Sequence, residues 1–118
     1  MFSLSVHAKE IALTFDDAPV GSTVFFETHQ RTNELIKKLK ALNVPPVIIF
    51  ANPCKRDDAN LVIEQLKAYT AGGHIIGNHT CSHPRFDKVG FEVFSADALK
   101  ADKILSPLYS GQKYFRYP

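Results

Sequence analysis

The chain has 118 residues, of which 45% are hydrophobic and 22% are charged, so its length suits one globular domain and excludes two sizeable ones. Its 14 basic and 12 acidic side chains are scattered along the sequence and give a formal net charge of +2, which excludes the basic surface typical of nucleic-acid or anionic-membrane binding. The scattered charge favours a small or neutral substrate. No apolar run approaches the roughly 18 residues that a bilayer-spanning helix needs, so we expect no membrane span.

The first residues are expected to form an N-terminal tail, residues 1–8, ahead of a single domain over residues 9–118. Residues 2–8 are similar to the end of a secretory signal peptide, although the charged and long apolar regions of such a peptide are missing. An ordinary N-terminal tail fits them equally well. The signal-peptide interpretation favours an extracytoplasmic location, periplasmic or secreted.

Residues 10–15 form a short apolar and β-branched run that predicts a strand, and this strand is expected to end just before Asp16 and Asp17. The carboxylates would then lie at the carboxyl end of the strand. Residues 32–42 carry apolar side chains at helical spacing with lysines on the other face, so they predict a helix, which the proline pair at 45–46 stops.

Residues 47–51 form a continuous apolar run preceded by prolines, which is typical of a strand buried on both faces of a parallel sheet. A second helix is expected to begin at about Asp58, as its N-cap, and to end at the glycine pair 72–73. Residues 74–77 predict a third strand, with His74 exposed at its start.

Residues 93–105 predict a third helix, which Pro107 ends, and residues 113–116 predict a fourth strand. The order is βαβαβαβ, which predicts an α/β fold with parallel strands joined by right-handed helical crossovers. In parallel α/β folds the chemistry gathers at the carboxyl ends of the strands. The aspartate pair, the histidines that follow the third strand, and Arg116 all fall at that rim.

Two histidines, His79 and His83, lie four positions apart, a spacing that can aim both imidazoles at one point. This spacing alone also fits surface or core histidines, and a metal site needs a third ligand, for which the aspartate pair is the best candidate. Cys54 and Cys81 are far apart in the sequence, so we expect neither a disulfide framework nor a thiolate metal site. As a metal ligand, the Cys81 thiolate ranks below both imidazoles.

One carboxylate and two imidazoles would leave a divalent ion with open coordination positions, which is typical of a catalytic zinc site. Zinc is the default ion, while iron, cobalt or manganese also accept two nitrogens and an oxygen. Such an ion polarises a substrate carbonyl and lowers the pKa of bound water. A second aspartate beside the ion could then act as the general base on that water, provided it is not itself a ligand.

Three segments resemble motifs of the polysaccharide deacetylases, the NodB-homology enzymes of carbohydrate esterase family 4. They are residues 11–19 (IALTFDDAP), 77–83 (GNHTCSH) and 115–118 (FRYP), which are similar to the first motif, the second motif and the start of the third. The resemblance covers essentially the whole chain. Ala18 stands where the family usually has glycine after the two aspartates, which is a small departure.

The resemblance implies a role for each matched residue. Asp16 would be the general base, while Asp17, His79 and His83 would be the metal ligands. Arg116 would pair with Asp16 and keep it ionised and oriented. These assignments give the two adjacent aspartates different roles.

Thr80 and Ser82 would hydrogen-bond within the second-motif loop and hold the imidazoles in place. The implied reaction is hydrolysis of an N- or O-linked acetyl group on a carbohydrate such as a chitin oligomer, peptidoglycan or xylan. The metal and a backbone N–H would hold the tetrahedral oxyanion.

The resemblance also implies a longer fold, a distorted (β/α) barrel of seven or eight strands, of which this chain would be the N-terminal half, truncated within the third motif. The fourth and fifth motifs, including the histidine that acts as general acid, are missing from the sequence. Four parallel strands cannot close a barrel, so we expect two copies to pair through the open sheet edges. A non-catalytic metal- or sugar-binding module is the alternative function.

Overall fold

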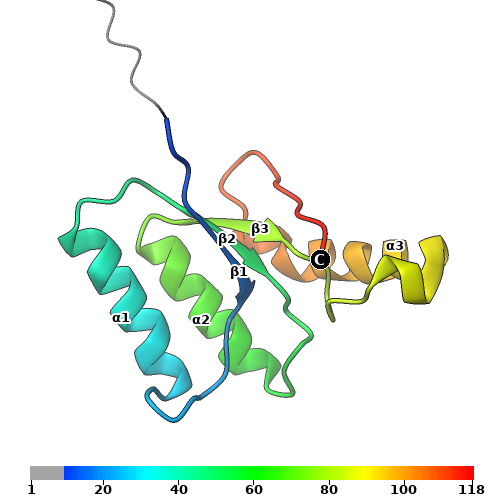
Figure 1. Ribbon diagram of the computed structural model, residues 1–118, viewed down its shortest axis with the longest axis horizontal. Helices are drawn as coiled ribbons and strands as arrows, with labels where there is room; N and C mark the ends of the chain where they lie inside the picture. The colour runs from blue at the N-terminus through cyan, green and yellow to red at the C-terminus, as the bar shows by residue number, and fades with distance from the viewer. Residues whose placement is uncertain (1–9) are drawn as a thin grey trace, which may run out of the picture.

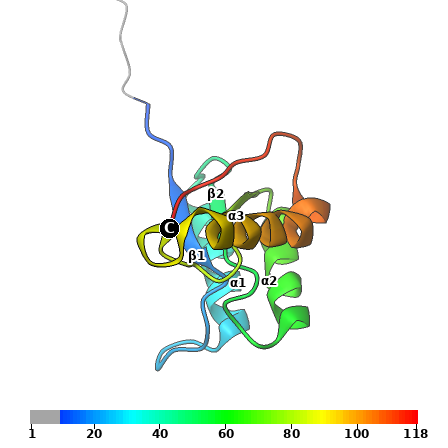
Figure 2. The ribbon, with the colours of Figure 1, turned by 90° about the vertical axis from the view of Figure 1, so that its right-hand side faces the viewer.

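The computed structural model describes residues 10–118, and the predicted N-terminal tail, residues 1–8, lies outside the described residues. Three parallel strands in the order β1-β2-β3 alternate with helices (Figure 1), so the predicted α/β class is confirmed. Figures 1 and 2 place α1 and α3 on opposite sides of the molecule, with the sheet between them. The elements are β1 (Thr14–Ala18), α1 (Thr28–Ala41), β2 (Ile48–Ala51), α2 (Ala59–Ala71), β3 (Ile75–Asn78), α3 (Phe86–Leu105) and a 3-10 turn (Ser106–Leu108).

β1 lies further along the chain than predicted, so Asp16 and Asp17 are inside the strand rather than after it. Its pairing with β2 begins at Thr14, because β2 begins only at residue 48, after the proline pair, and offers nothing for residues 10–13 to pair with. Ile11 and Leu13 are consequently exposed beside the outer strand β1. The expected pairing of two copies through such edges stays a prediction.

The predicted fourth strand is wrong, since residues 113–116 make a single parallel bridge between Asn78 and Phe115 instead of a strand. Two backbone hydrogen bonds flank this bridge, from Asn78 N to Tyr114 O at 2.8 Å and from Arg116 N to Asn78 O at 2.9 Å. The bridge lies at Asn78, the last residue of β3, so the C-terminal segment meets the sheet only where β3 ends. The bridge still brings Arg116 to the carboxyl end of the sheet, as predicted.

The helices begin where capping groups are present. α1 starts four residues earlier than predicted because Glu27 and Gln30 form a capping box. The predicted N-cap of α2 is confirmed, since the Asp58 side chain accepts a hydrogen bond from the N–H of Leu61 at 3.0 Å. α3 starts seven residues earlier than predicted and is kinked at Gly90, whose φ of 73° is a conformation that glycine tolerates.

The core lies between the sheet and the helices and is centred on β2. Ile49 and Ala51 are completely buried, as the continuous apolar run predicted, and they join Leu66 of α2, Ile76 of β3 and Leu105 of α3. Burial of each large aliphatic side chain contributes roughly 1.5–3 kcal/mol, so this core fixes the strands whose carboxyl ends carry the polar residues. No helix within residues 10–118 combines the length and apolar character needed to cross a membrane.

His74 is buried at the start of β3, so the prediction that it is exposed is wrong. Its Nδ1 accepts a hydrogen bond from the backbone N–H of Val47, the residue before β2, at 3.4 Å. Burial lowers the pKa of His74, because a protonated imidazole loses its hydration there.

We expect this histidine to make the fold sensitive to acid. Because the pKa is lower in the folded state, the unfolded chain binds more protons, so stability is lost as the pH falls below the unfolded value of about 6.5 towards the folded one. Urea unfolding between about pH 8 and pH 5, with a chelator present, should show a shallower pH dependence in His74→Asn than in the wild type. The same change at the exposed His29 is the control, and equal slopes for His74→Asn and wild type would contradict the expectation.

Candidate metal centre

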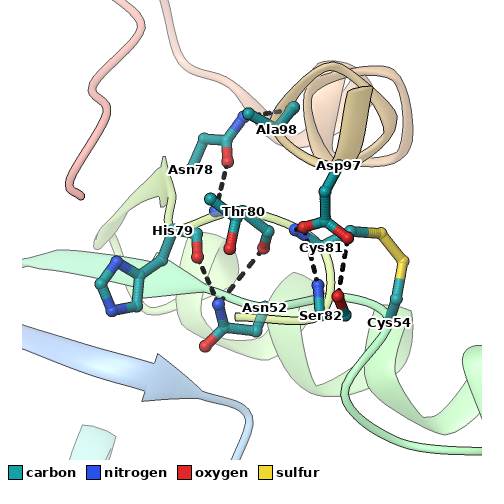
Figure 3. The surroundings of a disulfide bond; sticks show 9 residues. All are labelled: Asn52, Cys54, Asn78, His79, Thr80, Cys81, Ser82, Asp97 and Ala98. Atoms are coloured by element: carbon teal, nitrogen blue, oxygen red, sulfur yellow. Dashed lines mark hydrogen bonds between the residues drawn. A yellow bond between two sulfur atoms is a disulfide. The ribbon is translucent and has the colours of Figure 1, made fainter. Parts of the chain in front are cut away.

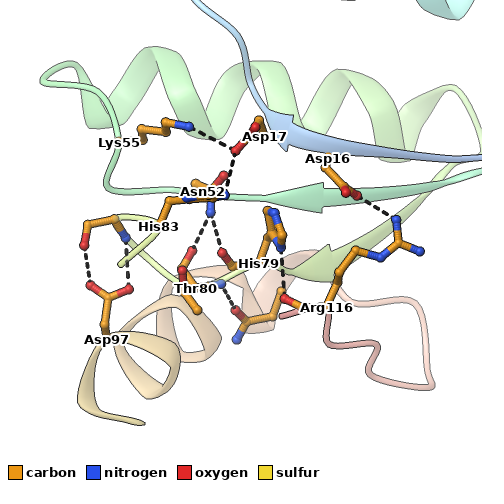
Figure 4. Close-up of polar contacts among 11 residues, drawn as sticks. Asp16, Asp17, Asn52, Lys55, His79, Thr80, His83, Asp97 and Arg116 are labelled. Carbon is orange, nitrogen blue, oxygen red and sulfur yellow. Dashed lines mark hydrogen bonds and ion pairs between the residues drawn. The ribbon is translucent and has the colours of Figure 1, made fainter. Parts of the chain in front are cut away.

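The structure brings the three predicted metal ligands together at the carboxyl ends of the strands. Asp17 comes from β1, and His79 and His83 come from the loop between β3 and α3 (Figure 4). One potential ligand atom from each residue lies within 4.8 Å of the others, and His83 Nε2 is 3.4 Å from Asp17 Oδ1. Two nitrogens and one carboxylate oxygen at this spacing fit a divalent ion of the zinc type.

The backbone at this site adopts an unfavourable conformation at several positions. Asp17, Thr80 and His83 have φ values of 61°, 67° and 63°, and within residues 10–118 Asn43 is the one other non-glycine residue with positive φ. Left-handed conformations are costly for residues with a Cβ and persist where the surrounding structure enforces them. The site is therefore held by specific contacts rather than by local conformational preference.

The hydrogen bonding of His79 indicates which ring nitrogen is available to a metal. Its Nδ1 lies 2.9 Å from the backbone carbonyl oxygen of Arg116. Because a carbonyl oxygen can only accept, Nδ1 carries the proton and donates it, and Nε2 is left with a free lone pair. His79 is 3% exposed, so this hydrogen bond fixes a buried residue with its Nε2 free to bind a metal.

Lys55 also lies at the site, although it is outside the sequence motifs that predicted the ligands. Its Nζ lies 3.0 Å from Asp17 Oδ1 (Figure 4). Partial burial raises the pKa of Asp17. The hydrogen bond and charge of Lys55, together with His83 and His79, lower it by more, so the net pKa is below its usual value. Asp17 is therefore a carboxylate at neutral pH. The sequence feature that could have pointed to Lys55 is its position just after β2, at the carboxyl ends of the strands.

Asp16 is turned away from the three potential ligands and towards Arg116 (Figure 4). Arg116 Nη1 lies 2.8 Å from Asp16 Oδ1 and donates to Thr14 Oγ1, also at 2.8 Å. The guanidinium carbon lies 4.3 Å from the centre of the Phe50 ring, which adds a cation–π contact. The expected ion pair between Asp16 and Arg116 is thus present, and Arg116 itself is held from two further sides.

Thr80 and Ser82 make contacts that differ from the predicted ones. The Ser82 hydroxyl donates outside the loop, to Asp97 Oδ2 in α3 at 2.7 Å. Thr80 takes part through its backbone, whose N–H donates to Asn78 Oδ1 at 2.8 Å, whereas within residues 10–118 its buried hydroxyl has no hydrogen-bond partner. Asn52, from the end of β2, donates its side-chain amide to the carbonyls of His79 and Thr80.

A disulfide bond joins Cys54 to Cys81 (Figure 3), so the prediction that these cysteines form no disulfide is wrong. Their Cα atoms are 4.8 Å apart, and the N–H of Cys54 donates to the carbonyl of Cys81 at 2.9 Å. Sequence separation concealed the pairing, because it is the adjacency of β2 and β3 in the sheet that places the loops after them side by side. The disulfide also removes Cys81 from the candidate metal ligands.

Removal of this disulfide is expected to cost about 3.5 kcal/mol of stability, because it closes a loop of 27 residues and restricts the unfolded chain accordingly. Urea unfolding of the oxidised wild type and of the Cys54→Ala/Cys81→Ala double variant would measure the loss. A reductant should destabilise the wild type and leave the double variant unchanged. Equal stability of the oxidised and reduced wild type would contradict the expectation.

Comparisons with known proteins place the chain in a family. The family model described as polysaccharide deacetylase matches residues 4–118. A curated peptidoglycan-N-acetylglucosamine deacetylase of Bacillus cereus is 32% identical over 118 residues, which cover 99% of this chain and 38% of that protein. The chain therefore spans well under half the length of this relative.

Two solved structures are similar to the fold. The crystal structure of a peptidoglycan N-acetylglucosamine deacetylase matches with a TM-score of 0.66 and 33% identity, over 86% of this chain and 42% of that one. A family 4 carbohydrate esterase from Bacillus anthracis matches with a TM-score of 0.67 over 91% of this chain and 47% of that one, at 24% identity, and supports the fold alone. With a family model that matches nearly its full length, this chain belongs to the polysaccharide deacetylase family.

Proposed function

We propose that this chain carries the metal centre of a polysaccharide deacetylase, which hydrolyses N- or O-linked acetyl groups on a carbohydrate polymer. The observation that carries the proposal is the convergence of Asp17, His79 and His83, with the Asp16–Arg116 pair beside them, in a member of this family. The second aspartate gives the site a base that is separate from the metal ligands.

Zn²⁺ is the ion that we propose, held by Asp17, His79 and His83, with cobalt, iron and manganese as alternatives that accept the same donors. When bound, such an ion supplies Lewis acidity, which polarises a substrate carbonyl and makes water more acidic. The proton on Nδ1 of His79, fixed by the Arg116 carbonyl, supports Nε2 as the ligating atom.

Asp16 is proposed as the general base that takes a proton from the attacking water. Its carboxylate is partly exposed, so substrate and water can reach it, and Arg116 orients it through the 2.8 Å ion pair. The cation–π contact with Phe50 and the bond to Thr14 keep Arg116 in place when the charge on Asp16 changes. Arg116 thus acts as a positioning residue for the base.

The substrate that we propose is a polymer of acetylated sugar, and N-acetylglucosamine oligomers are our first choice. The relative from Bacillus cereus is named as a peptidoglycan-N-acetylglucosamine deacetylase, which supports this choice. Chitin oligomers present the same N-acetyl group, and acetylated xylan would test O-deacetylation. The disulfide supports an extracytoplasmic location, because such bonds persist in oxidising compartments.

A non-catalytic metal- or sugar-binding module is the second candidate, and one observation favours it. Within residues 10–118 the histidines other than the two ligands lie away from the site, His29 in α1 and His74 at the amino end of β3. No third histidine of the described part can therefore protonate a leaving amine. In such a module the three metal ligands would be kept, but the chain would not hydrolyse the substrate.

Metal analysis combined with acetate release separates these functions. The 118-residue chain would be loaded with Zn²⁺, dialysed at neutral pH, and incubated with N-acetylglucosamine oligomers or acetylated xylan. Bound zinc with acetate release supports the deacetylase, whereas bound zinc without acetate supports the binding module. Absence of bound metal would contradict both.

A further inference from the structure

We propose that Asp97 of α3 is a positioning residue for the proposed metal centre, which it reaches through the loop that carries both histidines. The inference rests on the proposed metal function and extends it to a residue outside the three matched motifs. Asp97 contacts neither imidazole. Its effect is exerted through the backbone between His79 and His83.

The carboxylate of Asp97 accepts three hydrogen bonds from this loop (Figure 3). Oδ1 accepts from the backbone N–H groups of Cys81 at 2.6 Å and Ser82 at 3.0 Å, and Oδ2 accepts from the Ser82 hydroxyl at 2.7 Å. All three are charge-assisted, and such bonds are shorter and stronger than those between neutral groups. One side chain of α3 thus fixes two consecutive peptide units of the loop.

The loop needs an external hold because of its backbone conformation. The positive φ values of Thr80 and His83 flank the two peptide units that Asp97 holds. Residues with a Cβ retain this conformation when their surroundings enforce it, so loss of the hold should release the loop into more favourable backbone conformations. Relaxation at either residue would turn an imidazole away from Asp17.

The other contacts of the loop act on residues 79–81. Asn52 holds the carbonyls of His79 and Thr80, while the disulfide and the N–H of Cys54 hold the side chain and the carbonyl of Cys81. His79 is further fixed by the Arg116 carbonyl, whereas within residues 10–118 the one polar contact of the His83 side chain is with Asp17 itself. The orientation of His83 therefore depends on the backbone that Asp97 holds.

The variant Asp97→Asn tests the inference. Even if the amide oxygen keeps both backbone N–H groups and the Ser82 hydroxyl turns to accept from the amide nitrogen, none of the three bonds is charge-assisted any longer. We expect the dissociation constant for Zn²⁺, measured by competition with a chromophoric chelator, to rise roughly 10- to 100-fold, as for other outer partners of metal ligands. The visible absorption of bound Co²⁺, which reports ligand geometry, should shift as well.

Asp102→Asn is the matched control on the same helix. Its carboxylate accepts from the Tyr109 hydroxyl at 3.0 Å and from Lys113 Nζ at 2.9 Å, so the change removes the same charge and comparable bonds away from the loop. We expect it to leave zinc affinity and the Co²⁺ spectrum unchanged. Ser82→Ala removes one bond to Asp97 without changing charge and should give a smaller loss of affinity than Asp97→Asn.

The outcomes separate this inference from the proposed function. A wild-type chain that binds no zinc contradicts the metal centre and with it the role of Asp97. A wild type that binds zinc, together with Asp97→Asn of equal affinity and an unchanged Co²⁺ spectrum, overturns the role of Asp97 alone. If Asp97→Asn does not fold, as judged by circular dichroism, Ser82→Ala decides, and unchanged affinity in that variant overturns the inference.

Discussion

Replacement of His83 by alanine is expected to lower the affinity for Zn²⁺ by more than the roughly 100-fold that loss of an outer partner costs. The change removes one of three protein ligands and leaves Asp17 and His79 with a single nitrogen and a carboxylate. The fold should persist, because the His83 side chain is 31% exposed, lies in a loop and belongs to no core cluster. Competition titration with a chromophoric chelator would measure the affinity.

His29→Ala is the control for this experiment, since His29 is an exposed histidine of α1 outside the site. It should bind zinc as the wild type does. Equal zinc affinity of His83→Ala and wild type would show that His83 is not a ligand, even though it lies 3.4 Å from Asp17.

Replacement of Asp16 by asparagine is expected to leave zinc affinity intact and to lower acetate release by roughly 10²- to 10⁴-fold, the usual contribution of a general base. The amide has the shape of the carboxylate but cannot take a proton from water. Asp16 is not part of the group of potential ligands and pairs with Arg116 instead, so its replacement should not disturb the metal.

Both readouts would be taken on one preparation, with the exposed Asp87→Asn as the control. Loss of zinc in Asp16→Asn would show that the roles of the two adjacent aspartates are exchanged. Full acetate release with zinc bound would remove Asp16 from the role of base. The paired measurement is needed because both aspartates lie in β1.

The convergence of Asp17, His79 and His83 could be predicted from the sequence because the three residues are marked locally. The aspartates and histidines lie in short motifs next to apolar strands, and the rule that parallel strands present their carboxyl ends at one rim brings the motifs together. The Arg116–Asp16 contact followed from the same rule and the family resemblance. The prediction of a fourth strand was wrong, but the predicted Arg116–Asp16 contact is still present, because the single bridge at Asn78 is enough to place Arg116.

The supports of the site could not be predicted in this way. Lys55, Asn52 and Asp97 contact these three residues or their loop from other elements, and their positions depend on how the loops after β2 and β3 and the helix α3 pack. The disulfide was missed for the same reason, since a sequence separation of 27 gives no measure of the distance between its cysteines in space. The position of β1 depends on where its neighbour β2 begins, and the pattern of apolar residues in β1 does not indicate this.

X-ray absorption at the zinc K-edge of the zinc-loaded chain tests the central claim most directly, because it identifies the atoms around the ion. The claim is that Asp17, His79 and His83 hold the metal and that Cys81 is engaged in a disulfide. The predicted result is one zinc per chain with two imidazole nitrogens at about 2.0 Å, oxygen completing the first shell, and no sulfur. A sulfur neighbour at about 2.3 Å, a shell without imidazole, or a chain that retains no zinc would contradict the claim.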